Sequence, residues 1–424
     1  WIFKQANFQS HKLLLIYFYQ ILMRFDVMKK EIFNLTCSFG LESICKKELN
    51  FFNIKDIKLY NGFIKVNSDF DFIDKVKYIK TINRVFYIIK EENILNYDDI
   101  YKIMKSTNLK NYFYKMPSSI GIEINTQNTE FISKRTIFSV VSKSLKNFYN
   151  IHDFKSNDFK LGIFIYENLI SIGLDCFGIS LHKRFYRING GVSPIKENLA
   201  SAIVIKCLKP YHKFLVDPFC GSSTILTEAI LFLFAKKNPY LNPKIRLTDE
   251  IHNNKENEYL KMRSLYKTRF FIGSDIDENA IVNSKKNIEK MLKIYFNSNF
   301  NLVKIDNFIY LYKVNEKNDS FFIILINFDS YRLKDNLKKI EEYTEYLDQT
   351  KMLIITNLPY GKRLDKKFTN TNSIAAIQKI FTDFNCEKNF LSSMKYLPSI
   401  LKEKPDKKRK LFNGKIEVTL FTYE

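Results

Sequence analysis

The feature that most restricts the fold is an alternation of long helical and short apolar segments in the second half of the chain. Helical periodicity is found at 196–208, 224–235 and 279–292, and apolar strands are expected at 214–217 and 270–275. Strands that alternate with helices favour a parallel sheet with helices on both faces. We therefore expect the second half to be a doubly wound α/β domain.

The first half follows a different, α+β pattern. Its first part has strands and helices in the order β-α-β-β-α-β, which is typical of a ferredoxin-like domain, at residues 32–36, 41–49, 57–60, 62–66, 71–80 and 84–89. A second α+β alternation follows, with helices near 97–106 and 133–149 and strands near 120–125, 161–166 and 169–175. A Gly190-Gly191 pair after the basic, aromatic run at 181–188 marks the connector to the second half.

The start of the chain reads as an upstream extension. The chain begins at Trp1 rather than Met, and Met28 opens the first well-patterned segment, so residues 1–27 are expected to lie outside the native protein. Their apolar stretch at 13–22 is too short to span a bilayer and precedes no small-residue cleavage site, so no membrane partner is expected. The predicted organisation is therefore 28–90, 91–180 and 181–424.

Charge and cysteine content restrict the class of partner and the compartment. The chain has 424 residues, with 67 Lys and Arg against 45 Asp and Glu, and a net charge of +22. This excess favours a polyanionic partner. The abundance of Lys, Asn, Ile, Phe and Tyr also fits a bias toward AT-rich codons, which raises the Lys content regardless of function. The six cysteines form no C-x-x-C pair, which indicates reduced thiols in a cytoplasmic protein and predicts no bound metal.

The sharpest local motif is FLVDPFCGSSTILTEAI at 214–230. An apolar strand ends at Asp217, a turn contains Cys220 and Gly221, and Thr224 opens an amphipathic helix. In α/β sheets this arrangement places a ligand at the carboxyl ends of the strands, over the free amides of a helix N-terminus. A single glycine after a strand is a weak signal when taken alone.

Acidic residues follow the next predicted strands. Asp275 ends the strand FFIGSD, at the position where an acid commonly binds the two hydroxyls of a ribose, while Asp277 fits a cap of the following helix better. Asp306 ends the next strand along the chain and is expected to face the adenine end of such a ligand. Three acids beside a glycine turn favour an adenosine-containing cofactor.

A fourth motif, MLIITNLPYGKRL at 352–364, predicts a site for a base. The strand empties into Asn357, whose side-chain carbonyl can accept from an exocyclic amine, while Pro359 fixes the turn and Tyr360 can stack on the base. Enzymes that act on a base hidden in a helix hold the extruded base by hydrogen bonds and stacking. A plain Pro-Gly turn after a strand is the alternative.

Other chemistries are disfavoured. No cysteine that could act as a nucleophile lies near Asn357 in the sequence, and no G-x-x-x-x-G-K-[ST] motif occurs. Metal-dependent hydrolysis would need a cluster of histidines and carboxylates. The histidines are dispersed, at His11, His152, His182, His212 and His252.

Six landmarks in order resemble the bacterial family of RNA guanine-N2 methyltransferases that carry a THUMP domain and modify large-subunit ribosomal RNA. The resemblance covers nearly the whole chain from Met28, in SFGLESICKKEL, LHKRFYRINGGVSPIKENLASAI, DPFCGSST, GSDID, NLPYGKRL and RKLFNGKIEVTLFTY. It implies a ferredoxin-like segment and a THUMP domain that bind structured RNA, which in this family is 23S ribosomal RNA. It also implies a Rossmann-like class I methyltransferase domain that binds S-adenosyl-L-methionine.

The resemblance also implies a role for each motif residue. Residues that border the methionine part of the cofactor would be Asp217, Cys220, Gly221 and Thr224. The ribose would be held by Asp275, and the adenine would lie near Asp306. The guanine amine would be positioned by Asn357, Pro359 and Tyr360.

The chain departs from the family pattern at two positions. Ser223 stands where the family's cofactor turn usually has a second glycine, and Leu358 stands where its catalytic motif usually has a first proline. Ser223 would add a side chain where the backbone must approach the cofactor. One alternative is therefore an RNA-binding or assembly protein whose catalysis is weakened by Ser223 and Leu358. Another is a transfer RNA guanine or adenine amino-methyltransferase, because the asparagine-proline-aromatic motif also serves adenine.

Overall fold

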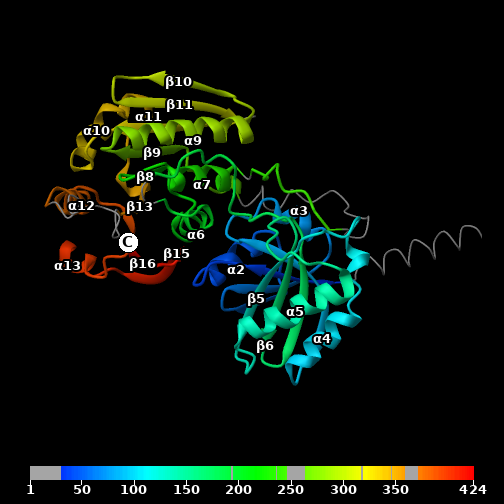
Figure 1. The fold of residues 1–424 in the computed structure, drawn as a ribbon. Helices are drawn as coiled ribbons and strands as arrows, with labels where there is room; N and C mark the ends of the chain where they lie inside the picture. The colour runs from blue at the N-terminus through cyan, green and yellow to red at the C-terminus, as the bar shows by residue number, and fades with distance from the viewer. Residues whose placement is uncertain are drawn as a thin grey trace, which may run out of the picture.

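The computed structural model describes residues 30–191, 194–234, 236–245, 263–316, 319–344, 346–358 and 371–424. The expected upstream extension at 1–27 lies outside these residues. Figure 1 shows two sheets, the first built from the first half of the chain and the second from the second half.

The first half forms alternating strands and helices close to the predicted positions. Its elements are β1 (Glu31–Thr36), α2 (Glu42–Asn50), β2 (Ile57–Tyr60), β3 (Phe63–Ser68), α3 (Phe72–Val76), β4 (Arg84–Asn93), α4 (Tyr97–Ser106), η1 (Leu109–Tyr112), β5 (Gly121–Gln127), α5 (Lys134–Tyr149), β6 (Lys160–Tyr166) and β7 (Leu169–Asp175). The β-α-β-β-α-β order predicted for the first ninety residues is confirmed. The helix predicted at 71–80 spans only Phe72–Val76 in the structure. Residues 79–82 are buried but form neither helix nor strand.

These strands form one sheet rather than two. Among the described residues its order is β2-β3-β1-β4-β7-β6-β5, and β4 pairs with β7 in antiparallel register. The expected boundary at residue 90 falls inside β4. Figure 1 shows α4 and α5 side by side against this sheet.

The second half begins its regular structure after the connector. Its elements are α6 (Glu197–Cys207), β8 (Phe214–Asp217), α7 (Thr224–Leu233), β9 (Phe270–Asp275), α9 (Glu278–Phe296), β10 (Phe300–Lys304), β11 (Ile309–Glu316), β12 (Asp319–Asn327), η2 (Ser330–Arg332), α10 (Leu333–Lys339), α11 (Glu341–Thr344), η3 (Gln349–Lys351), β13 (Met352–Asn357), α12 (Thr371–Asp383), β14 (Glu387–Ser392), α13 (Leu397–Leu401), β15 (Lys407–Asn413) and β16 (Ile416–Tyr423).

The second sheet has a parallel centre and antiparallel edges. Its order within the described ranges is β10-β11-β12-β9-β8-β13-β14-β16-β15. Strands β12, β9, β8, β13 and β14 run parallel, while β10–β11 at one edge and β15–β16 at the other are antiparallel. The predicted doubly wound α/β domain is confirmed.

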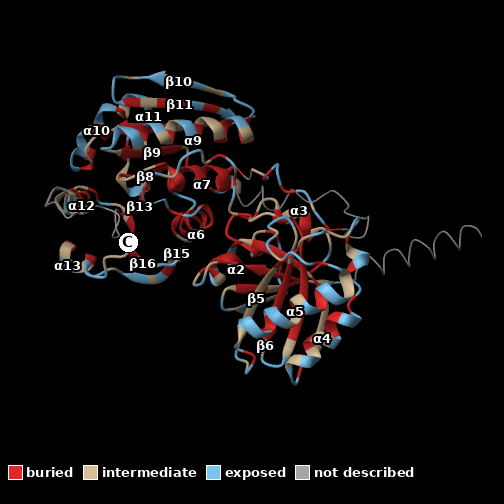
Figure 2. Ribbon diagram, viewed as in Figure 1, coloured by how far each residue is buried: buried red, intermediate tan, exposed pale blue. Residues whose placement is uncertain are grey.

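Helices cover both faces of this sheet. Leu215 of β8 packs in the core shared with α6, α7 and α9, whereas its neighbours Phe214 and Val216 pack in the core shared with α10, α12 and α13. This alternation follows from the two-residue period of a strand. Figure 2 shows the central strands buried on both sides, as a parallel sheet requires.

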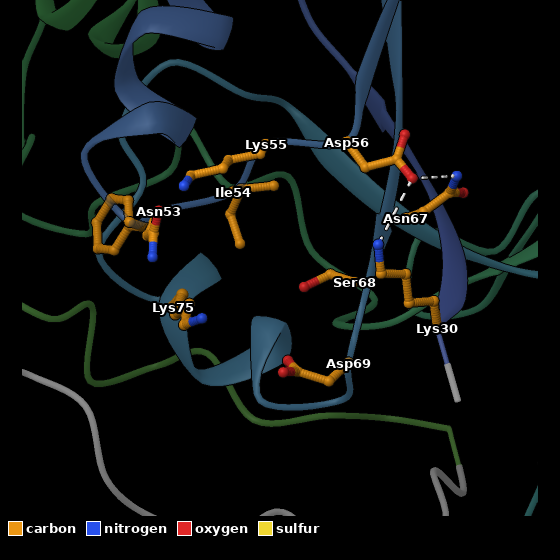
Figure 3. Close-up of a pocket in the computed structure, with 10 residues that line it drawn as sticks. Lys30, Asn53, Ile54, Lys55, Asp56, Asn67, Ser68, Asp69 and Lys75 are labelled. Carbon is orange, nitrogen blue, oxygen red and sulfur yellow. Dashed lines mark hydrogen bonds and ion pairs between the residues drawn. The ribbon is translucent and has the colours of Figure 1, made fainter. Parts of the chain in front are cut away.

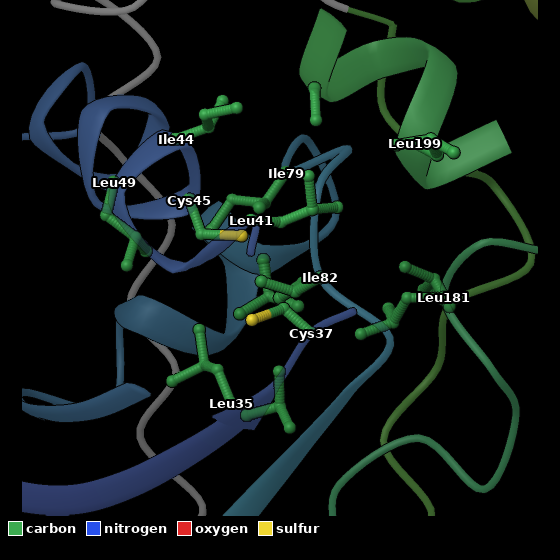
Figure 4. Close-up of a cluster of buried hydrophobic side chains, with 14 of the residues drawn as sticks. Leu35, Cys37, Leu41, Ile44, Cys45, Leu49, Ile79, Ile82, Leu181 and Leu199 are labelled. Atoms are coloured by element: carbon green, nitrogen blue, oxygen red, sulfur yellow. The ribbon is translucent and has the colours of Figure 1, made fainter. Parts of the chain in front are cut away.

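The two halves share one hydrophobic core. Figure 4 shows Leu41 and Cys45, from the start of the chain, near Leu181 of the connector and Leu199 of α6. Two polar contacts cross the same interface. The Lys47 ammonium donates to the Ile205 carbonyl at 2.8 Å, and the Arg409 guanidinium donates to the Gly40 carbonyl at 2.7 Å.

Buried charges also join the halves at the connector. Arg184 is 2% exposed; its Nε lies 3.5 Å from a carboxylate oxygen of Glu228, and its guanidinium also donates to the Lys80 carbonyl. The Tyr186 hydroxyl donates to the other Glu228 oxygen at 2.9 Å. Because an unpaired charge at this depth would be strongly destabilising, these contacts fix the connector between the two sheets.

Candidate functional site

The main cavity of the second half lies at the carboxyl ends of the central strands. Its volume is about 630 Å³, within the size range of small-molecule sites. Most of the predicted site residues in the described ranges line this cavity: Asp217, Cys220, Gly221, Thr224, Asp275 and Asn357. Residues predicted from separate motifs are therefore brought together by the parallel sheet.

The turn after β8 is held close to the end of β9. The Gly221 amide donates to a carboxylate oxygen of Asp275 at 2.9 Å, and the Cys220 amide donates to the Ser274 carbonyl at 2.9 Å. Gly221 has φ +52°, and no atom of the described residues lies within 4 Å of the position that a Cβ would take there. Its backbone therefore faces open space in the cavity.

Ser223 is accommodated by a hydroxyl partner on α9. It has a left-handed backbone (φ +59°), is fully buried, and its hydroxyl lies 2.9 Å from the Ser284 hydroxyl. Ser284 in turn donates to the Gly221 carbonyl at 2.6 Å. The expectation that Ser223 adds a side chain toward the cofactor is corrected, because its side chain is directed at α9 and does not line the cavity.

Asp217 is a fully buried carboxyl at the end of β8. Burial raises its pKa to about 7, and the nearby Asp275 carboxylate acts in the same direction. One of its oxygens accepts from the Phe219 amide at 3.3 Å. The carboxyl is therefore poised to change charge near neutral pH.

Asp275 and Asp277 have separate structural roles. Burial raises the pKa of Asp275, whose second oxygen accepts from the Asp277 amide at 3.0 Å. Asp277 accepts from the Asn279 amide at 2.9 Å and caps α9, as predicted. Both residues line the cavity.

Asn357 ends β13, the strand beside β8. Its side-chain oxygen is buried and has no hydrogen-bond partner among the described residues, although the residue lines the cavity. Such an acceptor is costly unless a partner is supplied. The predicted catalytic residues Pro359 and Tyr360 lie outside the residues that the structure describes.

Leu358 follows β13 directly and still hydrogen-bonds to β14. Its amide donates to the Leu391 carbonyl of β14 at 2.9 Å, a bond that proline cannot make. Its side chain is fully buried in the core shared with α10, α12 and α13. The departure from the family pattern at this position thus has a packing role.

Asp306 does not line the cavity. The strand before it, β10, is separated from β9 by β11 and β12, and one Asp306 oxygen accepts from the Phe308 and Ile309 amides of its own turn. The neighbour of β9 is β12, so Asp329 and Ser330, which follow β12, line the cavity instead. The part of the prediction that placed Asp306 beside the cavity is therefore wrong.

The connector supplies a further wall that the motif analysis missed. Asn189, Gly190 and Gly191 line the cavity. The Arg187 guanidinium donates to the Thr224 hydroxyl at 3.0 Å, and the Asn287 amide group donates to the Asn189 carbonyl at 3.0 Å. The only signal in the sequence was the Gly-Gly pair, which reads equally well as a linker.

A second cavity, of about 420 Å³, lies in the first half and is lined mainly by residues that precede β2 and by residues at the end of β3 (Figure 3). Its side chains include Lys55, Lys75 and Asp69, and Lys30 lies 4.0 Å from Asp56. None of the predicted site residues lines it.

The described residues contain no group of three or more His, Cys, Asp or Glu side chains placed to hold a metal ion. No helix among them has the length and apolar character needed to cross a membrane.

Curated relatives match most of the chain. It is 26% identical over 415 residues to "Ribosomal RNA large subunit methyltransferase K/L" of Buchnera aphidicola subsp. Schizaphis graminum, covering 91% of this chain and 53% of the relative. It is 25% identical to "Putative RNA methyltransferase YpsC" of Bacillus subtilis, covering 93% of this chain and 96% of that protein. The chain thus spans about half the length of the first relative and nearly all of the second.

A solved structure has a similar fold over most of the chain. SMU.472, a putative methyltransferase crystallised with SAH, aligns with a TM-score of 0.61 at 19% identity, covering 93% of this chain and 98% of that one. Residues 184–300, which contain the turn after β8 and the Asp275 motif, match the family model of the RMKL-like methyltransferase domain. This part of the chain is therefore similar to an RMKL-like methyltransferase domain, for which S-adenosylmethionine is the cofactor.

Proposed function

We propose that the chain methylates the exocyclic N2 of a guanine in large-subunit (23S) ribosomal RNA, with S-adenosylmethionine as the methyl donor. The observation that carries the proposal is the Asn357 side-chain oxygen, which is buried at the cavity without a partner among the described residues. An exocyclic amine supplies the donor that this acceptor lacks.

The cavity residues fit the cofactor. The open backbone at Gly221 allows close approach, and the Asp275 carboxylate at the end of β9 is placed for ribose hydroxyls. Asp217, at the neighbouring strand end, offers an anionic partner for an ammonium group. Bound S-adenosylmethionine would supply a methyl group that its sulfonium already activates.

The residues of the chain then act mainly by positioning. Asn357 accepts a hydrogen bond from the amine, directs the nitrogen lone pair into the cavity and stabilises the positive charge that develops on nitrogen. By the family resemblance, Pro359 would fix the turn and Tyr360 would stack on the base. This mechanism needs no strong general base.

RNA as the substrate is supported by three independent features. Two relatives carry RNA or ribosomal RNA methyltransferase in their names, and both match more than nine-tenths of this chain. The net charge of +22 suits a polyanionic partner. The first half offers a separate α+β sheet that can bind RNA while the second half performs the chemistry.

Two alternatives stay open. Transfer RNA guanine, or adenine in either RNA, presents a similar amine to Asn357. The reading as an assembly protein with weakened catalysis rested on Ser223 and Leu358, and both side chains are directed away from the cavity into hydrogen-bonded or packed positions. That placement favours an active enzyme.

The deciding experiment is methyl transfer to defined RNAs. Purified chain and labelled S-adenosylmethionine would be incubated with unmodified 23S ribosomal RNA, unmodified transfer RNA and, as a control, 16S ribosomal RNA. We expect methyl groups only in 23S RNA, with mass spectrometry of nucleosides identifying N2-methylguanosine. Label in transfer RNA alone, or in adenosine, would refute the proposed substrate.

A further inference from the structure

An exposed aromatic ring lies at the edge of the main cavity, in a position that the cofactor motifs do not include. Tyr331 belongs to η2, directly after Asp329 and Ser330, which line the cavity. Its side chain is 44% exposed. Single exposed tyrosines are ordinary, so the significance of this one depends on its surroundings.

A lysine from a second element lies over this ring. The Lys379 ammonium of α12 is 4.1 Å from the centroid of the Tyr331 ring, close enough for a cation–π contact. Ser373 and Ala376, on the same helix as Lys379, line the cavity. The ring and the ammonium therefore come from two elements that both border the cavity.

The backbone that carries the ring is held in place. Asp329 caps η2 by accepting from the Tyr331 amide at 2.9 Å, and the Ser330 hydroxyl donates to the Pro218 carbonyl. Leu333, two residues after Tyr331, is 1% exposed and packs in the core. An exposed ring on a fixed backbone loses little conformational entropy when a ligand stacks on it.

We propose that Tyr331 and Lys379 bind the RNA nucleotide next to the target base, with the base stacked on the face of the ring that Lys379 does not cover and the ammonium near a phosphate. The inference rests on the proposed function and deepens it. Extrusion of the target base leaves its neighbour without a stacking partner, and aromatic rings with nearby cations replace such partners without regard to sequence. The ring is distinct from the residues predicted to hold the cofactor.

The test separates RNA binding from cofactor binding and from turnover. The probe is a fluorescein-labelled stem-loop RNA with unpaired guanines in the loop, and its affinity is measured by anisotropy with saturating SAH. We expect Tyr331→Ala and Tyr331→Leu to weaken RNA binding about tenfold, and Tyr331→Phe to bind like the wild type, because only the aromatic face is needed. SAH affinity, measured by calorimetry, should be unchanged in all three.

Tyr346→Ala is the matched control. Tyr346 is 81% exposed and precedes β13, so it lies at the opposite end of that strand from Asn357. Its loss should leave RNA affinity within about twofold of the wild type. Lys379→Glu should weaken RNA binding and reduce the salt dependence by about 0.7 in the logarithmic slope, as expected for one lost phosphate contact on a single strand.

Two outcomes would overturn the inference. Unchanged RNA affinity in Tyr331→Ala would show that the ring does not stack on the RNA. Weaker SAH binding with unchanged RNA affinity would assign the ring to the cofactor instead. Failure of the proposed function is a separate result, because it would appear as absence of methyl transfer by the wild type, whereas the anisotropy measurement needs no turnover.

Discussion

The neighbouring strand ends of β8 and β13 border the same cavity but differ in how their polar groups are satisfied. After β8, the Gly221 amide, the Ser223 hydroxyl and the Thr224 hydroxyl all have partners on other elements. At the end of β13, the Asn357 side-chain oxygen has none among the described residues. The polar groups after β8 are thus paired within the chain, whereas the Asn357 oxygen has no partner among the described residues.

This difference indicates a division of labour. A turn whose polar groups are already paired presents a fixed backbone surface, which suits a cofactor that binds in the same way at every turnover. A buried acceptor without a partner forms its hydrogen bond only when the substrate donor binds, so the free energy of that bond contributes to substrate binding and catalysis.

Replacing Asn357 by Ala should have the largest effect. It removes the hydrogen-bond acceptor proposed for the amine, so we expect kcat for RNA methylation to fall by about 10²- to 10³-fold, as when a single stabilising hydrogen-bonding group is removed from other active sites. SAH affinity should be unchanged, as measured by calorimetry. A parallel loss of SAH binding would show that the two strand ends do not act separately.

Replacing Asp275 by Ala should have the converse effect. It removes the predicted ribose contact and the acceptor of the Gly221 amide, so SAH affinity should fall by about 100-fold, equal to about 2.7 kcal/mol. Asp277→Ala is the matched control, because Asp277 lines the same cavity but is assigned only the cap of α9, and its loss should cost about 1 kcal/mol of stability. Equal losses of affinity in both variants would contradict the assignment.

Ionisation of Asp217 should make cofactor binding depend on pH. Its pKa is raised to about 7 in the folded chain, so folding favours the neutral carboxyl. The stability that the neutral carboxyl contributes is fully present below the ordinary carboxyl pKa and is lost as the pH rises toward 7. A bound ammonium group favours the carboxylate. SAH affinity should therefore increase about tenfold from about pH 6 to about pH 8, and Asp217→Asn should abolish this slope; a slope that persists would locate the titrating group elsewhere.

Restoring the family's usual residues should have the smallest effects, and unequal ones. Ser223→Gly relieves a left-handed backbone and loses one hydroxyl contact, so stability to urea should change by less than about 1 kcal/mol. Leu358→Pro loses the bond to the Leu391 carbonyl and part of a buried side chain, and should cost about 2 kcal/mol. A gain of more than about 1 kcal/mol in Ser223→Gly would instead show that the contact with Ser284 does not offset the left-handed backbone.

The sequence predicted the parallel centre of the fold and three of the strand ends that border the cavity. Periodicity was sufficient because β8, β9 and β13 are short apolar strands, two of which lead into long helices. Asp217, Gly221 and Asn357 were found for the same reason, since the ends of parallel strands meet at one edge of the sheet. Their chemical roles remain predictions.

The position of Asp306 could not be predicted from chain order. Three strands, β10 to β12, follow α9, and only tertiary packing decides which of them lies against β9. A usable signal was present, since FFIILIN at 321–327 is a continuous apolar run, as a strand buried on both faces requires, while β10 is largely exposed. The Ser223–Ser284 pair was not predictable, because it joins residues 61 positions apart.

The core that the two halves share sets the geometry of the whole molecule. Because Arg184 is buried between Lys80 and Glu228, the first sheet cannot swing on the connector without exposing a charge pair and apolar side chains. The span from the first sheet to the Asn357 cavity is therefore fixed when the chain folds. Under the proposed function, the enzyme would select its target by the distance of that nucleotide from the RNA segment that the first half binds, and not only by the bases around it.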